Sequence, residues 1–285
     1  MITALIQAFI EQLLNEKATF IAIGGGSINH TYRINAGKQT FFCKLNSNTE
    51  LPGMFDAEQS GLALLASQQV IRIPRVIAKE EKDGTQLLIL EWVEQGVKTD
   101  AFWDTFGRQL AALHHVHYSQ YGLATNNYMG ALPQNNQFTG SWIEFFVRQR
   151  LQPQITLALS NKLLEPAHVK QFEKLYQQLA VMFSVEPPTL LHGDLWSGNF
   201  LCDEKGKPVL IDPAVYYGHR SMDLAMTTLF GGFDARFYES YNYHFPLPAN
   251  YREQWEVCNL YPLLIHLNLF GKSYLPGILN TIRQY

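Results

Sequence analysis

The chain has 285 residues, of which 47% are apolar and 16% charged, with 22 Lys and Arg against 25 Asp and Glu. A formal net charge of −3 provides no broad basic surface, so nucleic acid is not expected as a partner. Three scattered cysteines cannot form a disulfide framework, and no apolar stretch is long enough to span a membrane. We therefore expect a cytoplasmic, monomeric protein without membrane contact.

The first 93 residues show the pattern of a small sheet with one inserted helix. Apolar residues of segment 1–17 recur on one face of an amphipathic helix, and residues 54–66 have a similar helical spacing. An Asp-Gly pair at 83–84 is typical of a tight hairpin. Strands are expected over 20–23, 31–34, 39–45, 75–78 and 87–93. The order β, β, β, α, β, β predicts an antiparallel sheet.

From about Glu94 the pattern changes to long helical stretches. Extended structure is expected there only at 190–191 and in a hairpin over 200–211. Helices are predicted over 102–117, 142–159, 168–183, 222–230 and 251–269. We therefore predict an α+β protein with two lobes, residues 1–93 and 94–285, and a cleft between them.

The strongest chemical signal is the segment HGDLWSGN at 192–199, in which Asn199 follows Asp194 by five residues. This spacing matches the catalytic loop of kinases. A short loop can present Asp194 to an incoming hydroxyl group while Asn199 directs its carbonyl oxygen at Mg²⁺. Alone, Asp194 would more simply be a loop residue that forms an Asx turn.

Asp212 strengthens this interpretation. It directly follows the apolar strand residues 209–211 and precedes Pro213, where protein kinases place the metal-binding Asp of Asp-Phe-Gly. A carboxylate at the end of a strand can ligate Mg²⁺. Two further residues are given structural roles rather than catalytic ones. His192 is expected to brace the loop, and Asp223 is expected to cap a helix or to accept hydrogen bonds from the loop backbone.

The remaining kinase elements occur upstream in the expected order. Glycines in the segment 24–29, Gly25 and Gly26 with Ser27, let backbone amides approach phosphates, although this is neither a Walker A motif nor a dinucleotide fingerprint. Lys44 occupies the position of the phosphate-binding lysine, and Glu58 that of its ion-pair partner. The alternative for this pair is two solvated surface charges.

The strand over 87–93 ends where a hinge strand would offer backbone groups to adenine. The residues predicted for that contact are Glu91, Trp92 and Val93. The sequence therefore predicts ATP bound between the two lobes, with residues 1–93 as the ATP-binding lobe.

With these motifs in place, the chain resembles the fructosamine kinase family (ketosamine 3-kinases), relatives of aminoglycoside and choline kinases with a protein-kinase-like fold. The resemblance covers about residue 20 to the end. One departure is Ser27, where some members have Cys. The segments that carry the resemblance are HGDLWSGN at 192–199, DPAVYYGHR at 212–220, DLAM at 223–226, LFGGF at 229–233, Pro-Gln-x-Asn at 133–136 and LYPLLIHLNLFGKSY at 260–274.

The resemblance implies transfer of phosphate from ATP to O3 of a ketosamine, after which the product decomposes and frees the amine. It assigns Asp194 as the catalytic base, Lys44 to the phosphates, and Asn199 and Asp212 to Mg²⁺. It further implies that Trp196 stacks on the substrate. A polar rim around the substrate is expected from Gln134, Asn136 and His219.

Two other functions stay open at the level of the sequence. One is a kinase for an aminoglycoside, choline or a free sugar; an acidic cleft would favour a polycationic aminoglycoside. The other is a nucleotide-binding pseudokinase. The aromatic and neutral polar residues of the late helices argue against the first, and the intact Lys44, Glu58, Asp194, Asn199 and Asp212 argue against the second.

Overall fold

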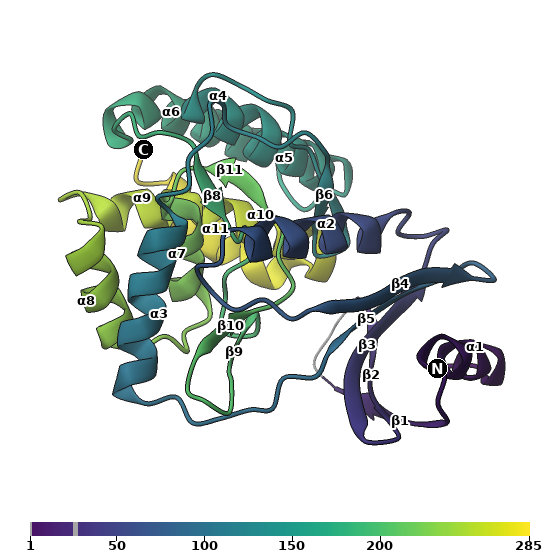
Figure 1. Cartoon of the computed structure of the whole chain (residues 1–285). Helices are drawn as coiled ribbons and strands as arrows, with labels where there is room; N and C mark the ends of the chain where they lie inside the picture. Colours follow the sequence, from purple (N-terminus) through teal and green to yellow (C-terminus); the bar gives the residue numbers. More distant parts are fainter. Residues whose placement is uncertain (1, 25–27) are drawn as a thin grey trace.

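The computed structural model describes residues 2–24 and 28–285. A five-stranded antiparallel sheet forms the N-terminal lobe, with the strand order β1-β2-β3-β5-β4 (Figure 1). The predicted order of strands and helix is confirmed, with some strands longer than expected. The strands are β1 (Ala18–Ile23), β2 (His30–Ala36), β3 (Gln39–Ser47), β4 (Val76–Lys82) and β5 (Thr85–Glu91).

Two helices cover opposite faces of this sheet, α1 (Ala4–Leu14) and α2 (Met54–Ser67). The alternation of side chains along β5 explains the arrangement, because successive residues of a strand point to opposite faces. Leu87 packs in the same cluster as Ile10 of α1, whereas Leu88 packs with residues of α2. The predicted amphipathic helix at the start of the chain is confirmed as α1.

The hairpin between β4 and β5 is confirmed at the predicted Asp-Gly pair. Asp83 has a φ of +48° and Gly84 a φ of +73°. Two successive residues with positive φ define a type I′ turn, whose twist matches that of the strands it joins. The turn therefore sets the register in which Lys82 pairs with Thr85.

The C-terminal lobe is mainly helical, with short strands between the helices (Figure 1). Its helices are α3 (Asp100–Leu113), α4 (Trp142–Phe145), the π-helix η1 (Phe146–Leu151), α5 (Gln152–Ser160), α6 (Pro166–Met182), α7 (Ser221–Leu229), α8 (Ala235–His244), α9 (Tyr251–Cys258), α10 (Leu260–Phe270), the 3₁₀ helix η2 (Lys272–Tyr274) and α11 (Leu275–Ile282). Its strands are β6 (Asn127–Met129), β7 (Leu132–Gln134), β8 (Thr189–Leu191), β9 (Phe200–Cys202), β10 (Pro208–Leu210) and β11 (Tyr216–Gly218).

The segments predicted as helices in this lobe are largely helical, and the hairpin predicted over 200–211 is confirmed as β9–β10. The single helix predicted over 251–269 is wrong, because α9 and α10 are separate and meet at Asn259. Within the described residues, no helix combines the length and the apolar character that a membrane span requires.

The two lobes are joined beside the β9–β10 hairpin. The Gly96 N–H donates to the Cys202 carbonyl oxygen (2.9 Å), and the Arg72 guanidinium contacts both Asp203 (2.7 Å) and Glu91 (3.0 Å). A Cβ at Gly96 would lie 2.1 Å from the Asp203 carbonyl oxygen, so this close approach requires glycine. The boundary predicted at residues 93 and 94 lies in this connection and stays a prediction.

Candidate active site

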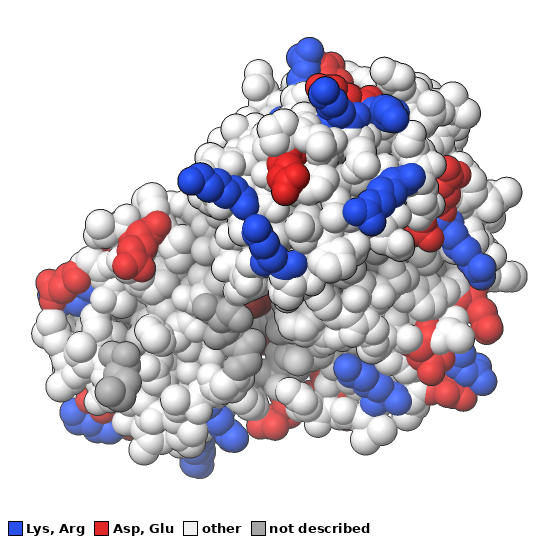
Figure 2. All heavy atoms as spheres, turned by 180° about the vertical axis from the view of Figure 1, so that it is seen from behind, with Lys and Arg blue, Asp and Glu red and all other residues white. Residues whose placement is uncertain are grey.

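A cleft of about 710 Å³ lies between the two lobes. Figure 2 shows the molecule from behind, with charged side chains of both signs distributed over both lobes. Residues from both lobes line the cleft, and the structure thus brings together five predicted site residues that are far apart in the sequence. They are Lys44, Glu58, Asp194, Asn199 and Asp212.

Lys44 on β3 is only 2% exposed and forms two ion pairs. Its Nζ lies 2.7 Å from Glu58 Oε1 and 2.6 Å from Asp212 Oδ1. Burial alone would lower the pKa of Lys44, but the two carboxylates outweigh this effect and raise the pKa above its usual value. The alternative of solvated surface charges is therefore wrong, and Lys44 is a permanent buried cation that faces the cleft.

Asp194 and Asn199 are held together across the loop between β8 and β9. The Asn199 Nδ2 donates to the backbone oxygen and to Oδ2 of Asp194, both at 2.8 Å. These bonds use both amide hydrogens, so the Asn199 Oδ1 is left as an acceptor. The pKa of Asp194 is raised to about 7, mainly by burial and to a smaller extent by the nearby negative charge of Asp212.

Two buried side chains brace this loop, as the sequence predicts. The His192 Nε2 lies 2.9 Å from the Ile211 carbonyl oxygen, and its Nδ1 lies 3.2 Å from the Asp194 N–H. Burial lowers the pKa of His192, so the ring is neutral, with Nε2 as donor and Nδ1 as acceptor. Asp223 accepts from the N–H groups of His192 (2.7 Å) and Gly193 (2.8 Å). The backbone that presents Asp194 is thus held by hydrogen bonds.

Asp212 follows β10 and has a left-handed backbone, with a φ of +54°. Asp tolerates this conformation better than most residues. The side chain is 39% exposed, contacts Lys44, and lines the cleft. Its carboxylate is therefore accessible from the cleft.

A recess of about 140 Å³ adjoins the cleft at the end of β5. The two share Asp212 and several apolar residues, and the recess is also lined by the predicted adenine contacts Glu91, Trp92 and Val93. The Glu91 carboxylate is engaged by Arg72 (3.0 Å) and Arg75 (2.8 Å). The predicted residues Gly25, Gly26 and Ser27 lie outside the described residues.

Aromatic residues form one wall of the cleft. Trp196 lies edge-on to Phe230, with ring centroids 5.8 Å apart, and a Cβ at Gly198 would lie 2.3 Å from the Trp196 ring. The ring of His266 lies 5.0 Å from those of both Phe230 and Tyr274. Sequence reasoning missed Phe230, His266 and Tyr274 as cleft residues, although LFGGF and the segment 260–274 were already notable as carriers of the family resemblance.

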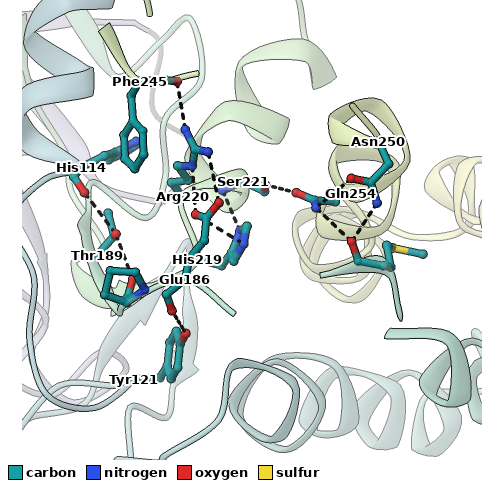
Figure 3. Close-up of polar contacts among 12 residues, drawn as sticks. His114, Tyr121, Glu186, Thr189, His219, Arg220, Ser221, Phe245, Asn250 and Gln254 are labelled. Carbon is teal, nitrogen blue, oxygen red and sulfur yellow. Dashed lines mark hydrogen bonds and ion pairs between the residues drawn. The ribbon is translucent and has the colours of Figure 1, made fainter. Parts of the chain in front are cut away.

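The predicted polar rim is wrong. Gln134, Asn136 and His219 are each 1% exposed or less and do not line the cleft. His219 lies inside the C-terminal lobe, where its Nε2 is 3.6 Å from the carboxylate of Glu186, which also binds Arg220 (Figure 3). Burial lowers the pKa of His219 to about 4, so the ring is neutral there. Gln134 and Asn136 belong to a different buried network, described below.

The fold is shared with solved kinases. A crystal structure from Thermobifida fusca, described as a fructosamine-3-kinase, is 33% identical, with a TM-score of 0.87 over 98% of this chain and 97% of that chain. An aminoglycoside phosphotransferase, solved with AMP-PNP and hygromycin B, is 16% identical with a TM-score of 0.68 over 99% and 98% of the two chains. Fold and cleft together define a two-lobed kinase, a phosphotransferase that acts on a hydroxyl group.

The family follows from sequence comparisons. The family model described as fructosamine kinase matches residues 1–285. A "Probable ketoamine kinase" of Synechocystis is 42% identical over 92% of this chain and 88% of its own length. The "Protein-ribulosamine 3-kinase, chloroplastic" of Arabidopsis thaliana is 35% identical over 96% and 86%. The chain belongs to the fructosamine kinase family, and the predicted resemblance is confirmed.

Proposed function

We propose that the protein transfers the γ-phosphoryl group of ATP to the O3 hydroxyl of a ketosamine, an adduct of a sugar and an amine. Decomposition of the 3-phosphate then frees the amine, so the activity is one of deglycation. Relatives named as ketoamine and protein-ribulosamine kinases support this substrate class. The observation that carries the proposal is Asp194, held by Asn199 in the cleft, with the Lys44–Glu58 pair on the opposite lobe.

The donor set of the cleft fits Mg²⁺. Among the described residues, no group of three or more His, Cys, Asp or Glu could hold a metal by itself. Mg²⁺ usually takes only one or two protein ligands and completes its shell with water and phosphate oxygens. The cleft-facing carboxylate of Asp212 and the free Oδ1 of Asn199 meet this requirement. When bound, Mg²⁺ neutralises charge on the phosphates.

The remaining roles follow from charge and position. The Lys44 ammonium is buried between two carboxylates and faces the cleft, where it can bind phosphate oxygens. The Asp194 carboxylate orients the acceptor hydroxyl and takes its proton at Oδ1 or Oδ2. A base whose pKa lies near the working pH is the most effective, and burial places Asp194 in this range. Positioning and charge supply most of the rate enhancement.

The acceptor side of the cleft favours a ketosamine over an aminoglycoside. The carboxylates among the described lining residues are Glu58, Asp194 and Asp212, and each has a role in phosphoryl transfer in this proposal. No acidic side chain therefore remains for a polycationic substrate among these lining residues. The aromatic wall instead provides ring faces, which can cover a polyol chain and attract a single protonated amine.

A substrate panel tests the proposed function. ATP consumption is measured with ribulose-lysine, fructose-lysine, an aminoglycoside, choline and free sugars at equal concentrations. We expect turnover with one or both ketosamines and little with the others, and phosphorus NMR should place the new phosphate on O3. A higher kcat/KM for an aminoglycoside or choline than for both ketosamines would make the assignment wrong.

Trp196 is expected to contribute to ketosamine binding. Replacing it with Ala should raise the KM for ribulose-lysine about 2- to 30-fold, the equivalent of about 0.5–2 kcal/mol of cation–π contact. The KM for ATP should stay the same, because Trp196 lies on the wall away from the recess at the end of β5. Trp196→Phe keeps an aromatic face and should lose less. If Trp196 only supports the loop, both KM values and the melting temperature will change together.

A further inference from the structure

Arg150 is a buried cation without a carboxylate partner among the described residues. Its side chain is fully buried, and its nearest polar contacts are oxygens of neutral groups. The Nη1 donates to the Asn135 carbonyl oxygen at 2.6 Å, and the Nη2 donates to Asn136 Oδ1 at 2.7 Å. The guanidinium carbon also lies 4.0 Å from the ring centroid of Tyr216 and 4.5 Å from that of Phe145. Because burial of an unpaired charge is unfavourable, this placement calls for a function.

Arg150 lies on the buried side of the π-helix η1, and π-helices are frequent at functional sites. Arg148, two residues earlier on the same helix, is exposed and pairs with Glu144 at 2.7 Å. Two residues take up about half a helical turn, so the side chains at 148 and 150 point to roughly opposite sides of the helix. Arg148 and Arg150 are thus two arginines in one helix with opposite environments.

Asn136 connects Arg150 to a further network of hydrogen bonds. Its Nδ2 donates to Asn127 Oδ1 at 2.9 Å, and the Gln134 Nε2 donates to the same oxygen at 2.7 Å. The Asn127 Nδ2 in turn donates to the Val215 carbonyl oxygen at 2.8 Å. The Gln134 Nε2 also lies 3.2 Å from the Ala214 carbonyl oxygen. The network therefore ends on the backbone of residues 214 and 215.

These end points lie at the active site. Ala214 and Val215 follow Asp212 by two and three residues, and the Ala214 N–H donates to the His192 carbonyl oxygen at 2.9 Å. The β6–β7 hairpin, which begins at Asn127, lines the cleft with residues 127–130. The Tyr128 hydroxyl donates to the Pro52 carbonyl oxygen just before α2 (2.9 Å) and thereby reaches the other lobe. Arg150 is thus connected both to the Asp212 segment and to a wall of the cleft.

We propose that Arg150 is a positioning residue for phosphoryl transfer. Through Asn136, Asn127 and Gln134 it holds the backbone after Asp212 and the β6–β7 hairpin in one fixed arrangement. The planar guanidinium fork suits this task, because it donates to two different oxygens at once, whereas a lysine provides a single flexible point charge. The proposal rests on the proposed function only for its kinetic readout.

Three variants of the full chain test the proposal. Arg150→Met removes the charge and the fork, and Arg150→Lys keeps the charge alone. Gln134→Met changes the size little and removes the hydrogen bonds that the Gln134 amide donates to Ala214 and Asn127 and accepts from the Tyr261 hydroxyl. Arg148→Met is the matched control on the exposed face of the same helix. For each variant we measure the melting temperature, hydrogen exchange of residues 212–216 and 127–134 without ligands, and steady-state kinetics with ribulose-lysine.

Both Arg150 variants should show a larger increase in hydrogen exchange in these two segments than elsewhere in the C-terminal lobe. Without the Arg150 bonds, local opening of these segments has fewer hydrogen bonds to break. Their kcat should fall about 10- to 10²-fold, the scale expected when reacting groups are slightly misplaced. The KM for ATP should change less than about threefold, and the Mg²⁺ concentration for half-maximal rate should rise. If Arg150→Met does not fold, the exchange and the kinetics of Arg150→Lys and Gln134→Met are compared with those of the wild type instead. Arg148→Met should match the wild type.

Two results would overturn the proposal. One is unchanged exchange in both segments together with a kcat within twofold of the wild type. The other is a uniform rise in exchange across the lobe and a lower melting temperature, with an unchanged kcat per folded molecule; Arg150 would then be a purely structural residue. If the wild type itself does not phosphorylate ketosamines, the proposed function fails, whereas localised exchange in the Arg150 variants still supports the positioning role.

Discussion

The Asp194→Asn variant is expected to lose about 10²- to 10⁴-fold in kcat, the usual contribution of a positioned general base. Asn is nearly the same size as Asp, and its Oδ1 can still accept the hydrogen bond that Asn199 donates at 2.8 Å. The loop should therefore keep its shape, and the variant should bind nucleotide as the wild type does. Only the ability to take the hydroxyl proton is removed.

Steady-state kinetics with ribulose-lysine, nucleotide binding by calorimetry and the melting temperature together check this expectation. Asp104→Asn is a suitable control, because it removes an exposed carboxylate from α3 without touching the cleft. A kcat within a few-fold of the wild type would remove Asp194 from the mechanism. A large loss of nucleotide affinity would instead indicate that the carboxylate acts in binding.

The Asp212→Asn variant is expected to lose at least about 10²-fold in activity, since a charged group that stabilises the transferring phosphate is lost. Asn is preferable to Ala here because the residue has a φ of +54°, a conformation that Asn also adopts readily. Lys44 keeps its ion pair with Glu58, so the cleft retains its cation. Excess Mg²⁺ should not restore the rate.

Activity measured over a range of Mg²⁺ and Mn²⁺ concentrations tests this role, with Glu204→Gln in the neighbouring β9–β10 loop as control. Glu204 is half-exposed and lies 3.9 Å from Arg72, away from the cleft lining. An unchanged Mg²⁺ titration in the Asp212→Asn variant would show that the cation is held by other groups.

Local patterns were sufficient for much of the fold. The apolar run over 87–93 predicts a strand, and the structure packs Leu87 and Leu88 of this strand against different helices. The Asp-Gly pair predicts the type I′ hairpin at Asp83 and Gly84. The spacing from Asp194 to Asn199 predicts a loop that brings the two together, and their side chains are hydrogen-bonded. Each of these features depends on residues that are close in sequence.

Features that depend on distant partners were not predictable in this way. Gln134 was expected at the substrate, but the Tyr261 hydroxyl and the Ala214 carbonyl oxygen, 127 and 80 residues away, hold it in the interior. A polar side chain is buried wherever the fold supplies hydrogen-bond partners, and the sequence near Gln134 does not contain them. The same reason applies to His219, which is enclosed near Glu186.

The amino-acid sequence by itself determined the two lobes, the family and the residues Lys44, Glu58, Asp194, Asn199 and Asp212, because ordered motifs and hydrophobic periodicity carry this information locally. The tertiary structure alone decided the aromatic wall and the inward direction of Arg150. Both arise where segments from different parts of the chain pack together. The environment of a side chain there is set by its neighbours in space, through burial and hydrogen bonding.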